Sequence, residues 1–320
     1  MSWFGVEIDG PLVLTRGVHF AATAVVAGAL LFRAVVADAV LRGEHQAGPV
    51  VALAGKQVRA VARIGLALTV VSGMTWVLLL TMSLSGESLG EAVMSGALRD
   101  VVNLTQFGMV SEIRLALAIV LAICLAFERS ALWRRLALGA ALCLMASIAW
   151  TGHAASTPHR LGYLHLAADV LHLTAAAAWV GGLVALALLL GIMRRGHAPV
   201  GPSLELDVAR RFSSLGMVSV ATLVMSGIVN AWILVGSFRG LVVTDYGWIL
   251  LVKIAVFAIM VAFAAVNRFW LTPQLGEATA EPDALGRLAR NTRIEIMLGL
   301  TVFAIVGVLG TLHPAIHLVK

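Results

Sequence analysis

Eight long apolar runs dominate this sequence of 320 residues and limit its fold more than any other feature. A helix needs about 20 apolar residues to cross the hydrocarbon core of a bilayer. The runs meet that length and lie roughly at 11–41, 58–83, 109–127, 132–151, 162–191, 212–236, 247–266 and 294–313. Backbone groups in lipid must bond within their own segment, which favours helices. We therefore predict an all-α, polytopic integral membrane protein with eight transmembrane helices.

The composition excludes most other classes of protein. Hydrophobic residues make up 60% of the chain and charged residues 12%. Soluble domains carry about 25% charged residues, so this chain cannot cover a water-facing surface. The two cysteines, Cys124 and Cys143, lie inside apolar runs, and we expect buried thiols rather than a disulfide framework.

The same sequence gives little sign of an enzyme. It lacks a nucleophile elbow, a phosphate-binding glycine loop and a zinc-protease motif. No hydrophilic stretch is long enough for a separate domain, which argues against an ATP-driven pump in this one chain. The net charge of +6 lies in short loops between the runs, so it indicates topology rather than nucleic-acid binding.

Basic residues gather on one side of the predicted bundle. The loops after the first, third, fifth and seventh spans carry them: Arg42, Lys56, Arg59, Arg63, Arg129, Arg134, Arg135, Arg194, Arg195, Arg210, Arg211, Arg268, Arg287, Arg290 and Arg293. Cytoplasmic loops are enriched in Lys and Arg, so we predict that both termini face outward. Seven histidines then fall in the outer half or on the outer face: His19, His153, His159, His165, His172, His313 and His317.

The two halves of the chain resemble each other. The first repeat would hold spans one to four, in 1–130 and 131–155, and the second would occupy 156–320. The equivalent positions are His19 and His172, Gly28 and Gly181, Ser72-Gly73 and Ser226-Gly227, Thr105 and Thr244, Gly108 and Gly247, and Arg114 and Lys253. An even number of spans keeps both repeats in one orientation, which predicts a pseudo-two-fold axis along the membrane normal.

The fifth span carries the sharpest group of candidate metal ligands. His165, Asp169 and His172 are spaced by four and three residues, which places them on one helix face. Two imidazoles and a carboxylate can bind a divalent transition metal. Further ligands would come from other helices: His19, His153 and His313. Alternatively, Asp169 holds an imidazole in one tautomer, or forms a structural ion pair with Arg16.

Other ionisable residues fit supporting or surface roles. Arg114 and Lys253 lie at a similar depth in the two halves. Their side chains either extend outward to the membrane surface or neutralise a buried carboxylate, and Arg16 is a further supporting charge. His159, His317 and His45 are typical of interfacial surface positions, whereas His165 and His153 remain open between surface and site.

Several segments resemble the copper resistance protein D (CopD) family. They are TGHAA at 151–155, DVLHLTAAAAWVGGL at 169–183, YGWILLVKIAVFAIMVAFAAVNRFWLTPQL at 246–275 and GTLHPA at 310–315. The resemblance implies an eight-span protein of the bacterial cytoplasmic (inner) membrane that handles copper, often beside a periplasmic copper-binding protein of the CopC type. It carries the family's functional positions to His153, Asp169 and His172, with the basic residue at Lys253.

Three functional hypotheses follow. The first is a copper-binding protein that captures the copper ion at the periplasmic side and moves it across the membrane. The second is a haem b-binding redox protein, in which His19 and His172 would hold the haem. The third is an assembly scaffold for a copper enzyme. The predicted inner half offers few ligands beyond Met and Cys, so the sequence shows no inward exit for copper.

Overall fold

The computed structural model describes residues 2–3, 6–7, 9–41, 48–127, 130–152, 157, 159–195, 202–276 and 283–318. Its α-helices are α1 (Gly10–Phe32), α2 (Asp38–Leu41), α3 (Gly48–Ser85), α4 (Leu89–Met94), α5 (Ala97–Leu104), α6 (Gln106–Ala126), α7 (Ala131–Ala146), α8 (His159–Ala176), α9 (Gly182–Arg194), α10 (Pro202–Val235), α11 (Phe238–Val243), α12 (Asp245–Val266), α13 (Thr272–Gln274) and α14 (Ala284–Leu309). Two short strands, β1 (Ser2–Trp3) and β2 (Val6–Glu7), pair antiparallel at the N-terminus.

Eight helical spans among the described residues confirm the predicted fold class. They are Gly10–Val40, Ala52–Ser85, Gln106–Ala126, Ala131–Thr151, Arg160–Arg194, Ser203–Val235, Asp245–Gln274 and Ala284–Leu309. Three of them stay continuous through a π-helical turn, at Arg33–Ala37, Ala177–Gly181 and Asn267–Leu271. Such turns insert a residue into the helix and re-aim the side chains around it.

Several spans are longer than their apolar cores. The eighth begins at Ala284, about ten residues before the predicted start near 294. Its first turns alternate buried Leu288 and Thr292 with exposed Arg290 and Arg293. Charged side chains end an apolar run, but they do not interrupt a helix whose opposite face is packed.

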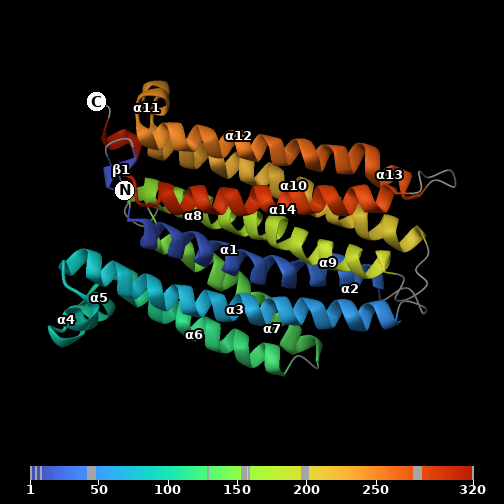
Figure 1. Ribbon diagram of the computed structural model, residues 1–320, viewed down its shortest axis with the longest axis horizontal. Helices are drawn as coiled ribbons and strands as arrows, with labels where there is room; N and C mark the ends of the chain where they lie inside the picture. Colours follow the sequence, from blue (N-terminus) through green and yellow to red (C-terminus); the bar gives the residue numbers. More distant parts are fainter. Residues whose placement is uncertain are drawn as a thin grey trace.

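Matching caps start two helices of the predicted repeats. The Thr105 hydroxyl accepts the Gly108 N–H at 3.0 Å at the start of α6, and the Thr244 hydroxyl accepts the Gly247 N–H at 3.1 Å at the start of α12. A hydroxyl at this position satisfies one of the free N–H groups of the first turn. Each capped helix follows a short helix, α5 or α11, at the same end of the bundle (Figure 1).

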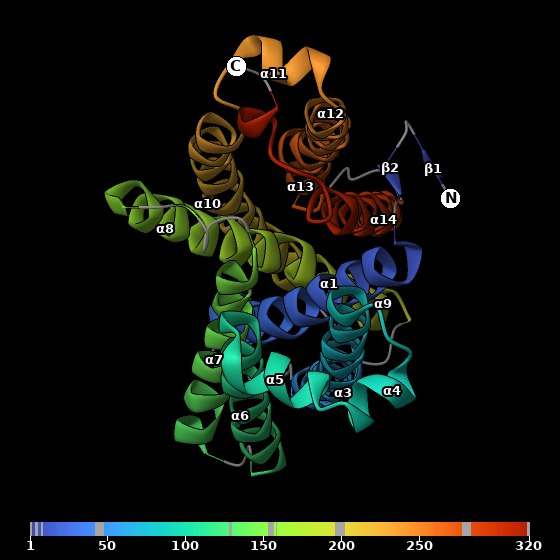
Figure 2. The same cartoon turned by 90° about the vertical axis from the view of Figure 1, so that its left-hand side faces the viewer.

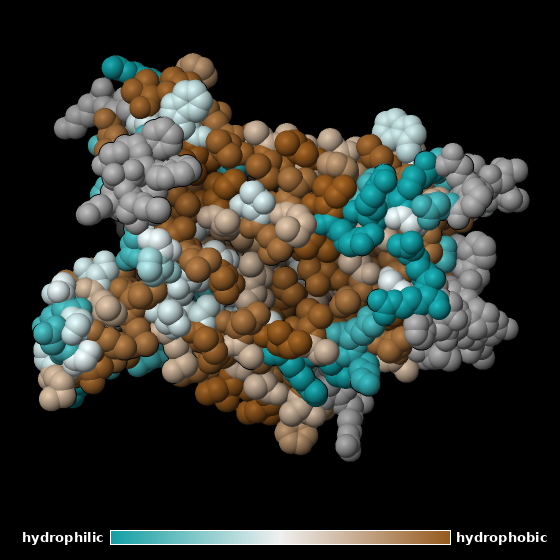
Figure 3. All heavy atoms as spheres, in the orientation of Figure 1, coloured by the Kyte–Doolittle hydropathy of each residue, from teal (hydrophilic) through white to brown (hydrophobic). Residues whose placement is uncertain are grey.

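Both termini lie at one end of the bundle, with α4, α5 and α11, and we call it the termini end (Figure 1). The opposite end, named the basic end, carries hydrophilic residues beside a broad hydrophobic belt (Figure 3). Viewed from the termini end, α3 to α7 lie on one side of α1, and α8, α10, α11, α12 and α14 lie on the other (Figure 2). The first span thus divides the two halves of the chain.

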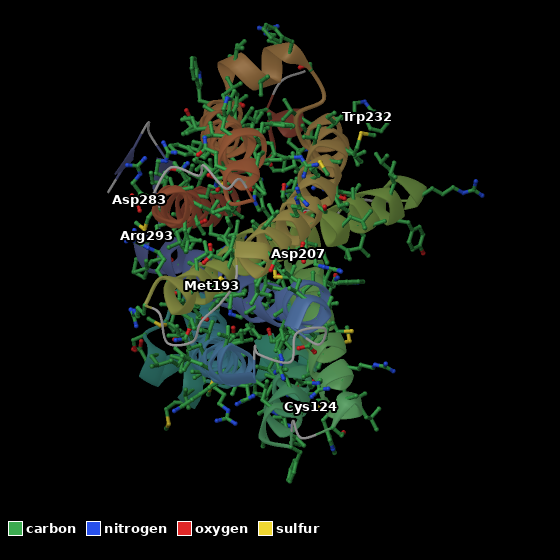
Figure 4. All side chains as sticks on the ribbon, turned by 90° about the vertical axis from the view of Figure 1, so that its right-hand side faces the viewer. Cys124, Met193, Asp207, Trp232, Asp283 and Arg293 are labelled. Atoms are coloured by element: carbon green, nitrogen blue, oxygen red, sulfur yellow. The ribbon has the colours of Figure 1, made fainter. Side chains whose placement is uncertain are left out.

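The two cysteines have different surroundings. Cys124 on α6 is buried, as expected, and lies on the side of the bundle away from the second half (Figure 4). Cys143 on α7 is exposed, so the expectation of a buried thiol was wrong there. An apolar residue in a span can face lipid as readily as protein, and an apolar run does not distinguish the two.

The first and fifth spans cross in direct backbone contact. A Cβ atom added at Gly28 would lie 1.9 Å from the Ala177 carbonyl oxygen, and one added at Gly181 would lie 2.2 Å from the Ala24 carbonyl oxygen. Gly28 and Gly181 therefore face each other with no room for a side chain. Small residues of this kind let membrane helices approach closely.

We expect Gly181→Val to destabilise the bundle by about 1–3 kcal/mol or more, because the side chain must push α1 away. Gly191→Val is the matched control, since Gly191 lies on the adjoining α9 with nothing within 4 Å of an added Cβ. Unfolding of the purified protein in mixed micelles, followed by tryptophan fluorescence, measures both. Equal stability of the two variants would contradict the close crossing.

Candidate functional site

His19 is fixed by a serine on the neighbouring helix. The Ser72 hydroxyl on α3 donates to the Leu68 carbonyl at 2.6 Å, so its oxygen is left to accept the Nδ1–H of His19 at 3.0 Å. This places the ring hydrogen on Nδ1 and the lone pair on Nε2. Nε2 of His19 is buried and has no hydrogen-bond partner in the described part of the chain.

His172 repeats this arrangement in the second half. The Ser226 hydroxyl on α10 donates to the Thr222 carbonyl at 2.5 Å and accepts from Nδ1 of His172 at 3.0 Å. A glycine follows each serine, and an added Cβ at Gly227 would lie 3.5 Å from Cε1 of His172. The helix pairs α1–α3 and α8–α10 therefore each hold a neutral imidazole whose Nε2 can bind a metal.

One turn closer to the termini end, the same helix pairs make a second contact with different chemistry. In the second half, Asn230 Nδ2 donates to Asp169 Oδ1 at 3.3 Å. In the first half, the Arg16 guanidinium carbon lies 5.1 Å from the centre of the Trp76 ring. Arg16 and Asp169 each precede the histidine by three residues, and Trp76 and Asn230 each follow the serine by four.

A third helix adds a basic residue to each group. Lys253 on α12 interacts electrostatically with Asp169, although the two do not form a direct ion pair among the described residues. In the first half, buried Arg114 on α6 lies 5.4 Å from the centre of the same Trp76 ring that Arg16 covers. The first-half group therefore holds two cations, and the second-half group holds one cation and one carboxylate.

The predicted ion pair between Arg16 and Asp169 is not formed. Arg16 Nη1 instead donates to the Gly310 carbonyl at 2.8 Å, at the end of α14. This bond satisfies a carbonyl of the last helical turn. Asp169 is left with Asn230 and the nearby Lys253 and Tyr246.

The remaining predicted ligands that the structure describes form no metal-binding cluster with His172. His165 is buried on α8, and its Nδ1 lies 2.7 Å from the Thr157 hydroxyl. His313 is exposed after α14, and His153 lies outside the described residues. No three His, Cys, Asp or Glu side chains of the described residues cluster closely enough to hold a metal ion.

Ser226, Asn230 and Tyr246 belong to the second-half group but were not predicted as site residues. Ser226 and Asn230 are four residues apart, so they share a face of α10 just as Asp169 and His172 share a face of α8. The recurring Ser-Gly pair was the available signal, but it did not show which side chain the serine would contact. The shared contacts fit the duplication, which itself stays a prediction.

Family models match both halves of the chain. The model for the copper resistance protein D-like N-terminal domain matches residues 7–163, and the model for copper resistance protein D matches residues 206–309. No solved structure matches the chain.

Three curated proteins show the same relationship. Copper resistance protein D from Pseudomonas syringae pv. tomato is 35% identical over 80% of this chain and 82% of its own length. Copper transport protein CutJ from Bacillus subtilis is 32% identical over 59% of this chain and 35% of its own length. Inner membrane protein YebZ from Escherichia coli is 30% identical over 52% of this chain and 55% of its own length.

We expect Ser72→Ala to lower the free energy of unfolding by about 0.5–1.5 kcal/mol, because it removes the hydroxyl that accepts from the buried Nδ1–H of His19. Ser226→Ala should cost less, since His172 is only half-buried. Ser214→Ala is the control, because exposed Ser214 bonds only to its own helix. Unfolding in mixed micelles measures all three, and a Ser72→Ala value equal to the control would refute the contact.

Proposed function

The chain belongs to the copper resistance protein D family, and on that premise we propose that it binds copper at the termini end and moves it across the cytoplasmic membrane. The observation that carries the proposal is the His172–Ser226 pair beside Asp169. The hydroxyl holds the imidazole with its Nε2 lone pair free, which is the form of histidine that ligates copper.

Asp169 would provide the charge that copper needs. It lies one turn from His172 on the same helix face, so one ion can contact both side chains or be balanced by the carboxylate. Lys253 and Asn230 keep the carboxylate oriented when no cation is present. A complete coordination shell needs further ligands, and the candidates are His165, on the same helix as Asp169, and His153, which lies outside the described residues.

The first-half group suits a different role. Nε2 of His19 likewise has no hydrogen-bond partner among the described residues, but Arg16 and Arg114 both contact the adjoining Trp76 ring. Two guanidinium groups repel a copper ion in a low-dielectric environment. We therefore assign capture of copper to the second half and support of the bundle to the first.

The termini end would face the periplasm. The clusters of Arg and Lys lie at the basic end, and such clusters mark the cytoplasmic side. Copper would then enter from the periplasm, where a copper-binding protein of the CopC type is the proposed donor. Movement would run along the second half toward the basic end.

We expect His172→Ala and Asp169→Asn to lose bound copper, and Ser226→Ala to weaken copper binding about 10–100-fold by freeing the imidazole. His317→Ala is the control, since His317 is exposed at the same end. Metal analysis and copper titration of the purified protein measure the effects. Unchanged copper stoichiometry in both His172→Ala and Asp169→Asn would rule out the site.

The same preparations test the two other functions. A haem Soret band that is present in the native protein and disappears in His19→Ala and His172→Ala would show that the site binds haem b rather than copper. Copper binding without copper flux into liposomes would instead indicate an assembly scaffold. Flux that depends on His172 supports transport.

The orientation has its own test in intact cells of a Gram-negative host. With Cys124 and Cys143 replaced by Ala, we expect Ser95→Cys, between α4 and α5, to react with a membrane-impermeant maleimide added outside. Asp283→Cys, at the start of α14, should react only after the cells are opened. The reverse pattern would place the termini in the cytoplasm.

A further inference from the structure

A cavity lies in the basic-end half of the second repeat. Its volume is about 310 Å³, and it is bounded by α9, α10, α12, α14 and both π-helical turns of the second half. Figure 4 faces this end and shows Met193 on α9, Asp207 on α10 and Arg293 on α14, the helices around the cavity. The walls are mostly apolar, with Leu183, Val220 and Val261 among them.

One carboxylate lies in this apolar wall. Glu295 on α14 is only 2% exposed. Asn267 Nδ2 donates to its Oε1 at 2.6 Å, and Asn291 Nδ2 donates to Oδ1 of Asn267 at 2.9 Å. The Trp179 indole also interacts with the carboxylate. The side-chain amide that bonds to Glu295 belongs to Asn267, the first residue of the π-helical turn Asn267–Leu271.

No basic side chain of the described residues forms an ion pair with Glu295. Arg268 is the other charged residue that lines the cavity, and its Nη1 donates to the Ser213 hydroxyl at 2.6 Å. Among the charged groups of the helices packed around Glu295, Arg293 donates to its own helix at Ala289, and Arg33 on the first span pairs with Asp38. The hydrogen-bonding neighbours of Glu295, Asn267 and Trp179, are therefore neutral.

A buried carboxylate whose hydrogen-bond partners are neutral and that has no ion-pair partner favours taking up a cation over remaining ionised. Copper needs two or more ligands, and no metal-binding cluster includes Glu295 among the described residues. A proton needs only one oxygen. We propose that Glu295 is a proton-binding site that exchanges its proton through this cavity.

The position of Glu295 gives the proton site a role. Asp169, His172 and Trp179 lie along one continuous span, Arg160–Arg194, and Trp179 is the residue of this span that interacts with Glu295. The fifth span thus carries Asp169 itself and contacts Glu295 of the eighth span through Trp179, ten residues further toward the basic end. Glu295 would couple proton movement to copper movement; this coupling rests on the proposed function, whereas the proton site does not.

A lipophilic carbodiimide tests the site directly. The protonated carboxyl adds across one C=N bond of dicyclohexylcarbodiimide: its proton goes to nitrogen, its oxygen bonds the central carbon, and acyl migration leaves a stable N-acylurea with no leaving group. We expect peptide mass spectrometry of the full chain in lipid nanodiscs to find the adduct at Glu295. The labelling rate should fall about tenfold per pH unit once the carboxyl ionises.

Cavity variants make the test specific. Gly216 lines the cavity, and an added Cβ there meets nothing within 4 Å, so Gly216→Leu should fill the space and slow labelling several-fold. Gly191→Leu, equally open but outside the lining, is its matched control. Glu205→Gln, on α10, should leave the Glu295 adduct unchanged. This comparison remains valid even if Glu295→Gln fails to fold.

An unlabelled Glu295 in folded protein, or labelling that Gly216→Leu leaves unchanged, would overturn the proposal. Labelling that stoichiometric copper abolishes would also overturn it, by making Glu295 a copper ligand. For the coupling, Glu295→Gln should keep copper binding at the termini end and lose the dependence of liposome copper uptake on a pH gradient. Retained dependence overturns the coupling, while absence of copper binding in the native protein overturns only the proposed function.

Discussion

The backbone contact between Gly28 and Gly181 is the constraint on which the rest of the bundle depends. It brings the first and fifth spans together without intervening side chains, and these are the most buried spans, at 67% and 72% of their apolar windows. The seventh span, at 6%, is mostly exposed on the outside of the bundle. The helices that carry His19 and His172 are thus the central ones, and the others pack around them.

The two histidines on these central helices make the same contact with a neighbouring helix. Each central helix runs beside one long partner, α3 or α10, and the pairing sets serine against histidine at the same distance in both halves. The flanking contact then differs, with a cation over an aromatic ring in one half and a carboxylate bonded to an amide in the other. The same histidine–serine contact therefore stands beside two arginines in one half and beside a carboxylate and a lysine in the other.

The residues divide into those that a sequence pattern can find and those that it cannot. Spacing alone placed Asp169 and His172 on one face of a helix, and the structure agrees. Spacing could not find Asn230 as the partner of Asp169, because the match depends on the register between two helices. The sequence did not predict Glu295 as a buried residue for a related reason. It lies among arginines at the start of a span, where an acidic residue is typical of a solvent-facing turn. Only packing shows that it faces inward.

The sequence by itself determined the class of the protein, its eight spans and the side on which its basic residues gather. These follow from the length and charge of each segment, because each segment must by itself match the thickness of the bilayer and the charge preference of its two sides. The tertiary structure decided which imidazoles have serine partners, that Arg16 bonds to Gly310 rather than Asp169, and that Glu295 lines a cavity. Those outcomes depend on the crossing of helices far apart in the chain, and apolar helices of similar composition carry no local signal of which neighbour they will meet.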